Sequence, residues 1–286
     1  MTASEAPRTI VFVHGLWLTS ESWQGWRARY EAAGHRTLAP EWPGMGLPLD
    51  ELRLAPRASR VGLIEIVDAY AAVINQLDER PVIMGHSIGG LLVQLLLDRG
   101  LGSAGVAISP GGVKGVARIP LSTARSGLAV LGNPANTRRT VALTRRQWHY
   151  AFANTLSRAK SDELWERYSA PTPGRPLWQA ATATLNPRAA NKVDLHNADR
   201  PPLLIHANTA DHTVPASLAR AAYKVQRKTG AVTEIHEFPG RPHLTGLVEG
   251  WEQVADDALD WALGFPTGPI AAPATTATAH PIGKHR

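Results

Sequence analysis

The sequence predicts an α/β protein with a mainly parallel sheet of about six strands, helices on both faces and a helical cap insertion. Short runs rich in valine and isoleucine alternate with segments of helical periodicity, which is typical of parallel strands joined by crossover helices. These runs lack polar alternation, as expected for strands covered on both faces. One interval of about ninety residues contains no convincing strand, and we expect it to form the cap.

The predicted strands are the apolar runs 9–13, 36–39, 81–84, 104–108, 202–206 and 232–238. The helical patterns between them cover residues 20–34, 63–77, 88–99, 216–229 and 247–263. In the strand-free interval, helix-like segments at 145–157, 161–169 and 176–186 are divided by prolines, which interrupt helices. We therefore predict a core from 8–109 and 201–265 and a cap from 110–200. Residues 266–286, rich in Pro, Ala and Thr, are expected to be a disordered tail.

Composition excludes several classes of protein. With 286 residues, 44% of them hydrophobic, the chain can bury a sizeable core. The absence of cysteine excludes disulfides, thiolate nucleophiles and cysteine-ligated metal centres. No apolar stretch approaches the roughly 18 residues of a membrane span, and no secretion signal is recognisable at the start. We therefore expect a cytoplasmic protein without a membrane partner.

The net charge of +6 and the pI near 9.9 raise the question of nucleic-acid binding. The basic residues are scattered along the sequence, and the Arg-Arg doublets are 138–139 and 145–146. Binding a duplex requires a clustered basic patch or a recognition motif, and neither is visible in the sequence. We expect no nucleic-acid partner.

The segment Gly85-His86-Ser87-Ile88-Gly89 is a Gly-x-Ser-x-Gly motif between a predicted strand and a predicted helix. A turn this tight leaves no room for side chains at the two motif glycines, and it lifts the Ser87 hydroxyl above the sheet at the positive end of the helix dipole. The alternative is a glycine-rich turn whose serine only caps the helix. The strand–turn–helix context favours Ser87 as a nucleophile.

A serine hydroxyl needs a base to take its proton, and a third group must orient that base. In a parallel sheet, both partners are expected just after the carboxyl ends of later strands. Asp211 follows the run 202–206, and His243 follows the run 232–238. We therefore predict Asp211 as the acid and His243 as the general base.

Other acids and histidines fit these roles less well. Asp194 and Asp199 precede the strand and lie at its wrong end. His212 adjoins Asp211, so it cannot easily reach Ser87. The remaining candidates lie in predicted strands or carry no motif: His206, His236, His149 and His196.

With these motifs, the chain resembles the α/β-hydrolase superfamily over most of 9–265, and in particular small bacterial serine hydrolases with a helical cap, of the uncharacterised esterase and haloperoxidase-like kind. The resemblance implies that Asp211 of Asp-His-Thr-Val-Pro is the acid and that His243 of Gly-Arg-Pro-His is the base. It also implies that His14-Gly15-Leu16-Trp17 forms the oxyanion loop. The antiparallel strand pair that opens many members is missing, and Glu41 stands where aspartate is common.

Acyl transfer also requires N–H donors for the developing oxyanion, and we expect these to be the backbone amides of Leu16 and Ile88. Trp17 is the best candidate for a pocket wall. Further candidates for the substrate pocket are His86, Trp148 and Phe152. The alternative for the cap aromatics is that they only pack the cap helices together. An apolar pocket would favour uncharged esters, lactones or thioesters.

These observations predict a cofactor-independent serine hydrolase that cleaves a small-molecule carboxylic ester, lactone or thioester through an acyl-enzyme intermediate. Haloalkane dehalogenases and epoxide hydrolases of this fold use aspartate at the elbow, so Ser87 argues against both. We expect no metal. A perhydrolase, acyltransferase or lyase with the same triad is an alternative, as is a ligand-binding member without turnover.

Overall fold

The computed structural model describes residues 6–54, 57–116 and 120–270, and these contain one six-stranded parallel sheet. The strand order is β2-β1-β3-β4-β7-β8, which confirms the predicted sheet. The strands are β1 (Thr9–Val13), β2 (Arg36–Leu38), β3 (Val82–His86), β4 (Ala104–Ile108), β7 (Leu203–Asn208) and β8 (Thr233–Phe238). Every pair is parallel, so all six carboxyl ends lie along one edge of the sheet, where the candidate site residues follow.

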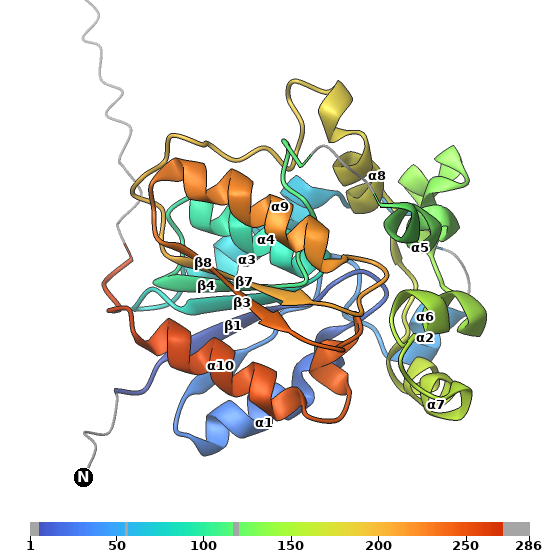
Figure 1. Cartoon of the computed structure of the whole chain (residues 1–286), viewed down its shortest axis with the longest axis horizontal. Coiled ribbons are helices and arrows are strands. Elements are labelled where there is room, and N and C mark those ends of the chain that lie inside the picture. The colour runs from blue at the N-terminus through green and yellow to red at the C-terminus, as the bar shows by residue number, and fades with distance from the viewer. Residues whose placement is uncertain (1–5, 55–56, 117–119, 271–286) are drawn as a thin grey trace, which may run out of the picture.

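Helices cover both faces of the sheet, as predicted (Figure 1). One face carries α1 (Gln24–Ala32) and α10 (Trp251–Leu263), and the other carries α3 (Leu63–Ile74), α4 (Ile88–Asp98) and α9 (Ala216–Gln226). The predicted helices at 20–34 and 247–263 were too long, because 3-10 turns at Ser20–Trp23 and Thr245–Leu247 precede α1 and α10. A short helix, α2 (Leu49–Arg53), was not predicted.

Both faces of the sheet are buried, which explains the missing polar alternation in the strands. In β1, Ile10 and Phe12 pack in the α1–α10 layer, whereas Val11 and Val13 pack in the opposite layer. Burial of apolar side chains on both faces is the main stabilisation of such a sheet.

The cap lies between β4 and β7 and contains α5 (Leu121–Leu131), α6 (Arg145–Ala151), α7 (Arg158–Tyr168) and α8 (Arg175–Ala181). The prediction of no strand here was wrong in detail, since β5 (Thr140–Val141) pairs antiparallel with β6 (Thr172–Pro173). Two residues per strand are too few to produce a readable pattern. α5 was also missed, because its glycine and serine obscure the helical period.

Part of the predicted tail contacts the core. The Thr267 hydroxyl donates to the carbonyl of Arg80 at 3.0 Å, and the Arg80 amide donates to the carbonyl of Gly268 at 2.9 Å. Residues 271–286 lie outside the described residues, and the domain boundaries stay a prediction. Within the described ranges, no helix has the length and apolar character needed to cross a membrane.

Candidate active site

Ser87 lies in a strained turn between β3 and α4. Its backbone has φ 58° and ψ −119°, which costs about 1–3 kcal/mol in a non-glycine residue. Its amide donates to the carbonyl of Ile108 at 2.9 Å, which holds the turn against the next strand. A Cβ at Gly85 would lie 2.3 Å from the Gly89 carbonyl oxygen, and one at Gly89 would lie 2.1 Å from the Val13 carbonyl oxygen. The motif glycines are therefore sterically required.

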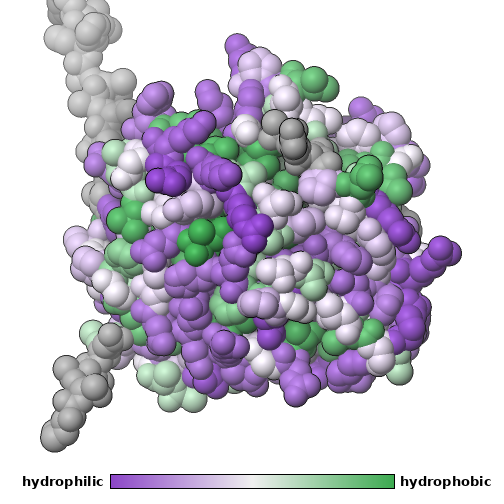
Figure 2. Space-filling model, in the orientation of Figure 1, coloured by the Kyte–Doolittle hydropathy of each residue, from purple (hydrophilic) through white to green (hydrophobic). Residues whose placement is uncertain are grey.

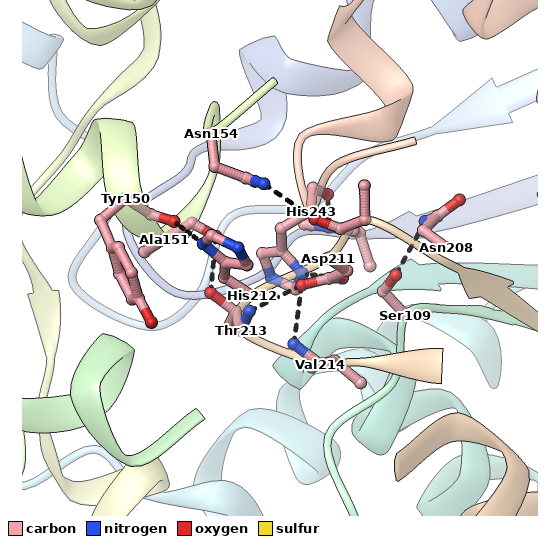
Figure 3. A network of polar contacts seen from close by, with 12 residues as sticks. Ser109, Tyr150, Ala151, Asn154, Asn208, Asp211, His212, Thr213, Val214 and His243 are labelled. Atoms are coloured by element: carbon pink, nitrogen blue, oxygen red, sulfur yellow. Dashed lines mark hydrogen bonds and ion pairs between the residues drawn. The ribbon is translucent and has the colours of Figure 1, made fainter. Parts of the chain in front are cut away.

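His243 and Asp211 form a buried pair on the loops that follow β8 and β7 (Figure 3). His243 Nδ1 lies 2.6 Å from Asp211 Oδ2, while Asp211 Oδ1 accepts from the amides of Thr213 and Val214, each at 2.7 Å. An ionised carboxylate accepts only, so this contact assigns the proton to Nδ1. His243 Nε2 is buried and has no hydrogen-bond partner among the described residues, so its lone pair is available as a base.

The electrostatics of this pair favour an ionised acid. Burial alone would raise the pKa of Asp211, but His243, the Val214 amide and the Ser109 hydroxyl outweigh burial and keep that pKa below its usual value. The Ser109 hydroxyl also accepts from the Asn208 side-chain amide at 2.8 Å (Figure 3). Asp211 therefore stays charged at neutral pH and can stabilise an imidazolium on His243.

His86 packs against the candidate base. Its ring centroid lies 4.5 Å from that of His243, and its Nε2 lies 2.8 Å from the His243 carbonyl oxygen. Burial, followed by the charge of His243, lowers the pKa of His86 to about 3. His86 is therefore neutral at physiological pH and donates its Nε2 proton to the backbone that carries the base.

This assignment predicts an effect of His86→Gln on acid stability. The folded state keeps His86 neutral down to about pH 3, whereas the unfolded chain takes up the proton below about 6.5, so stability falls with decreasing pH in that window. One such group contributes about 1.4 kcal/mol per pH unit to the slope. Chemical denaturation between pH 4 and 7 should show a shallower slope in the variant, and an unchanged slope would contradict the assignment.

The loop after β1 runs against the nucleophile. A Cβ at Gly15 would lie 3.0 Å from Ser87 Cβ and 2.8 Å from the His86 carbonyl oxygen. Trp17, at φ 62°, is held to the cap because its amide donates to Thr172 Oγ1 at 3.0 Å and its carbonyl accepts from Ala170 at 2.9 Å. This arrangement fixes the conformation of the loop beside Ser87.

The amides predicted as oxyanion donors are both available. Those of Leu16 and Ile88 have no acceptor among the described residues, and Ile88 is the first residue of α4, whose N–H lacks an intrahelical partner. His14 anchors the same loop, since its Nε2 lies 3.1 Å from Glu41 Oε2 and its ring stacks on Trp42.

Replacing Gly15 by alanine is expected to displace this loop and lower kcat by about 10²–10³-fold, the cost of losing one oxyanion donor. The matched control is Gly46→Ala, because no atom lies within 4 Å of the added Cβ and its φ is ordinary. Steady-state kinetics on an activated ester, with thermal melting to verify folding, would test the pair. Equal kcat values in both variants would count against an oxyanion role.

A cavity of about 140 Å³ contains Ser87 and is roofed by the cap. Leu16, Trp17 and Ile88 line its floor, and residues of the 111–116 loop, α5 and α8 form the remaining walls. The sequence did not indicate that α5 and α8 line the cavity, because their lining residues are mostly small and carry no motif. Trp17, the predicted pocket wall, is among the residues that line this cavity.

Three predicted pocket residues lie elsewhere. Trp148 and Phe152 stack on each other at 4.6 Å, and Phe152 meets the His243 ring edge-on at 4.8 Å. Neither is among the described residues that line the cavity, and His86 faces a separate cavity of about 20 Å³ beside Trp23 and Trp26. A role of these three side chains in a substrate pocket stays a prediction, and in the structure they pack around the candidate base.

The cap segment 150–154 is bonded to both loops of the pair (Figure 3). The Asn154 side chain donates to the Ala210 carbonyl at 2.9 Å, and the Thr213 hydroxyl donates to the Ala151 carbonyl at 2.7 Å. On the other loop, the Leu244 amide donates to the Phe152 carbonyl at 2.9 Å. This part of the cap therefore helps to position Asp211 and His243.

A second histidine–aspartate cluster lies under α10. Asp257 Oδ2 is 2.9 Å from His206 Nε2 and 2.8 Å from His236 Nδ1. Within the described ranges, these three are the group whose ligand atoms are close enough to hold a metal ion. The Asp257 carboxylate contacts both imidazole rings.

Comparison with known proteins agrees with this architecture. A sequence model of the alpha/beta hydrolase family matches residues 10–257. The chain is also similar to "Probable esterase PIR7A" of Oryza sativa subsp. indica, at 37% identity over 94 residues, 31% of this chain and 33% of that protein. It thus matches only about a third of the length of that curated relative.

Solved structures with the same fold include three hydrolases. The Paleococcus ferrophilus monoacylglycerol lipase superposes with a TM-score of 0.60 at 18% identity, covering 91% of this chain and 96% of the lipase. Polyneuridine aldehyde esterase superposes with a TM-score of 0.63 at 18% identity, covering 90% of this chain and 100% of the esterase. An extracellular alpha/beta-hydrolase from a Paenibacillus species superposes with a TM-score of 0.63 at 20% identity, covering 90% of this chain and 99% of that hydrolase. At these identities the likeness shows the fold alone.

Proposed function

Because the chain belongs to the alpha/beta hydrolase family, we propose that it is a serine hydrolase that cleaves a carboxylic ester, or a related lactone or thioester, without a cofactor. The observation that carries the proposal is the buried pair of His243 and Asp211, whose available Nε2 lies on the same sheet edge as the strained Ser87. The similarity to the probable esterase named above supports an ester substrate.

In the proposed mechanism, Ser87 Oγ attacks the carbonyl carbon while His243 Nε2 takes its proton. Asp211 stabilises the imidazolium that forms. The amides of Leu16 and Ile88 donate to the oxyanion of the tetrahedral intermediate. His243 then protonates the leaving alcohol, and the acyl group stays on Ser87.

Deacylation uses the same groups. His243 removes a proton from water, which attacks the acyl-enzyme and releases the acid. The cavity under α5 and α8 is proposed to take the larger apolar part of the substrate. Its walls include Val113, Leu131 and Leu177, and its small residues leave space between them.

The proposal is tested with p-nitrophenyl esters of increasing acyl length and with a fluorophosphonate probe on the wild-type protein. We expect turnover with an initial burst of nitrophenol equal to the enzyme concentration, the sign of an accumulating acyl-enzyme. The acyl length with the highest kcat/KM would indicate how long an acyl chain the cavity accommodates. Absence of both turnover and probe labelling would overturn the proposal in favour of a ligand-binding role.

A further inference from the structure

The net positive charge of the protein lies in the cap. Residues 110–161 contain nine basic residues and no acidic one. Residues 110–200 together carry 14 basic and 5 acidic residues, so the rest of the chain is net negative although the whole is +6. Such asymmetry indicates an anionic partner for the basic cap.

The few acids of the cap do not cancel this charge near α5. All three acids within 110–193 lie on α7, and each pairs with a nearby base: Asp162 with Arg158, Glu163 with Lys160, and Glu166 with Arg145. The segments that flank the cavity, 110–144 and 168–193, contain no acidic residue. The α5 side of the cap is therefore the most basic part.

The same side exposes large apolar side chains. Leu121 is 90% exposed and Leu128 is 60% exposed. The exposed Arg125 lies between them at helical spacing, and its guanidinium lies over the Tyr150 ring, 3.9 Å from the ring centroid. Leu185, which is 87% exposed, ends the 3-10 turn after α8, the helix that packs against α5. Figure 2 shows apolar side chains among hydrophilic ones over this part of the cap.

The opposite side of α5 has a different role. Thr123, Ala124, Ser126 and Gly127 line the cavity that contains Ser87, and Val130 is buried. The leucines of the outer side are therefore not needed to close the core. Leaving such side chains in water is unfavourable, and exposed apolar patches among charges mark interaction sites.

We propose that Leu121, Arg125, Leu128 and Leu185, here called the α5 face, dock on an anionic lipid surface. Leucines that protrude from a helix can enter the boundary between headgroups and acyl chains, while arginines pair with lipid phosphates. A protruding helix face with a charge between its leucines suits a fluid surface, which requires no matching shape. Docking would bring the roof of the cavity to the lipid, contrary to the sequence expectation of no membrane partner.

The test is co-sedimentation with vesicles of phosphatidylcholine, with and without phosphatidylglycerol. We expect at least about tenfold tighter binding to the anionic vesicles and a decrease with added salt. Leu121→Ser combined with Leu128→Ser should weaken that binding at least about tenfold. Arg125→Glu should weaken binding at low salt. Thermal melting verifies that each variant is folded.

The matched control is Val232→Ser, which removes a 47% exposed apolar side chain at the amino end of β8, away from the sheet edge with Ser87. It should bind as the wild type does. Because docking does not require turnover, the assay uses Ser87→Ala protein, so its result is independent of the proposed catalysis.

Equal binding to both vesicle types, or unchanged binding of the double leucine variant, would overturn the proposal. A dimer in gel filtration that the double variant dissolves, without vesicle binding, would assign the α5 face to self-association and equally overturn it.

Discussion

Replacing Ser87 with alanine is expected to lower kcat for a p-nitrophenyl ester by about 10⁴- to 10⁶-fold. The loss is large because no acyl-enzyme can form, and His243 then has no hydroxyl to activate. Remaining turnover would come from the oxyanion donors and from substrate binding. Alanine relieves none of the backbone strain at φ 58°, so we expect little change in the position of the turn.

The matched control is Ser103→Ala. Ser103 is also a buried serine, but it precedes β4 and lies at the amino edge of the sheet, where its hydroxyl accepts from Arg8 at 3.2 Å. That variant should keep wild-type kcat. Fluorophosphonate labelling should disappear in Ser87→Ala only. Labelling that persists in Ser87→Ala would show that another residue is the nucleophile.

Asp211→Asn is expected to lower kcat by about 10⁴-fold, with little change in KM. An asparagine amide facing His243 would donate where the carboxylate accepts, so the ring would have to place its proton on Nε2. The imidazole could then no longer take the Ser87 proton. The amides of Thr213 and Val214 would keep an acceptor in the side-chain oxygen, so the loop should stay folded.

The chain offers a closely matched control in Asp257→Asn. Asp257 contacts two histidines, at 2.9 and 2.8 Å, as Asp211 contacts one at 2.6 Å, but its cluster lies under α10. We expect its replacement to affect stability and to leave kcat within a few-fold. A comparable loss of kcat in both variants would mean that the Asp211 effect is structural.

Acid stability adds a second readout for Asp211. Because its folded-state pKa lies below the usual value, the ionised form contributes stability above that value, and this contribution is lost as the pH falls through the folded pKa. The asparagine variant should lack this part of the pH dependence. An identical slope in the wild type and the variant between pH 5 and 2 would argue against the assignment.

The main features of the core could be predicted from the sequence. Buried parallel strands need unbroken apolar runs, so β1, β3, β4 and β7 stand out as runs of Val, Ile and Leu. The Gly-x-Ser-x-Gly turn was also predictable, since steric contacts at Gly85 and Gly89 admit no side chain. Strand order along the chain then placed Asp211 and His243 on the same sheet edge as Ser87.

Much of the cap could not be predicted from the sequence. Its helices are short, its two-residue strands have no pattern, and α5 lines the cavity with small residues that carry no signal. Aromatic side chains draw attention in a sequence, yet Trp148 stacks on Phe152, and Phe152 packs against His243. Which face of a helix meets the site depends on how the cap is seated on the core.

The sequence by itself determined the sheet, the elbow and the candidate triad residues, because local sterics and strand periodicity act over a few neighbouring residues. Only the tertiary structure decided which side chains surround them. His86 meets the His243 carbonyl across 157 positions, and the Trp17 amide meets Thr172 across 155. Asp257, on α10, reaches both His206 on β7 and His236 on β8. Such contacts follow from the packing of distant segments, which leaves no periodic trace in the residues themselves.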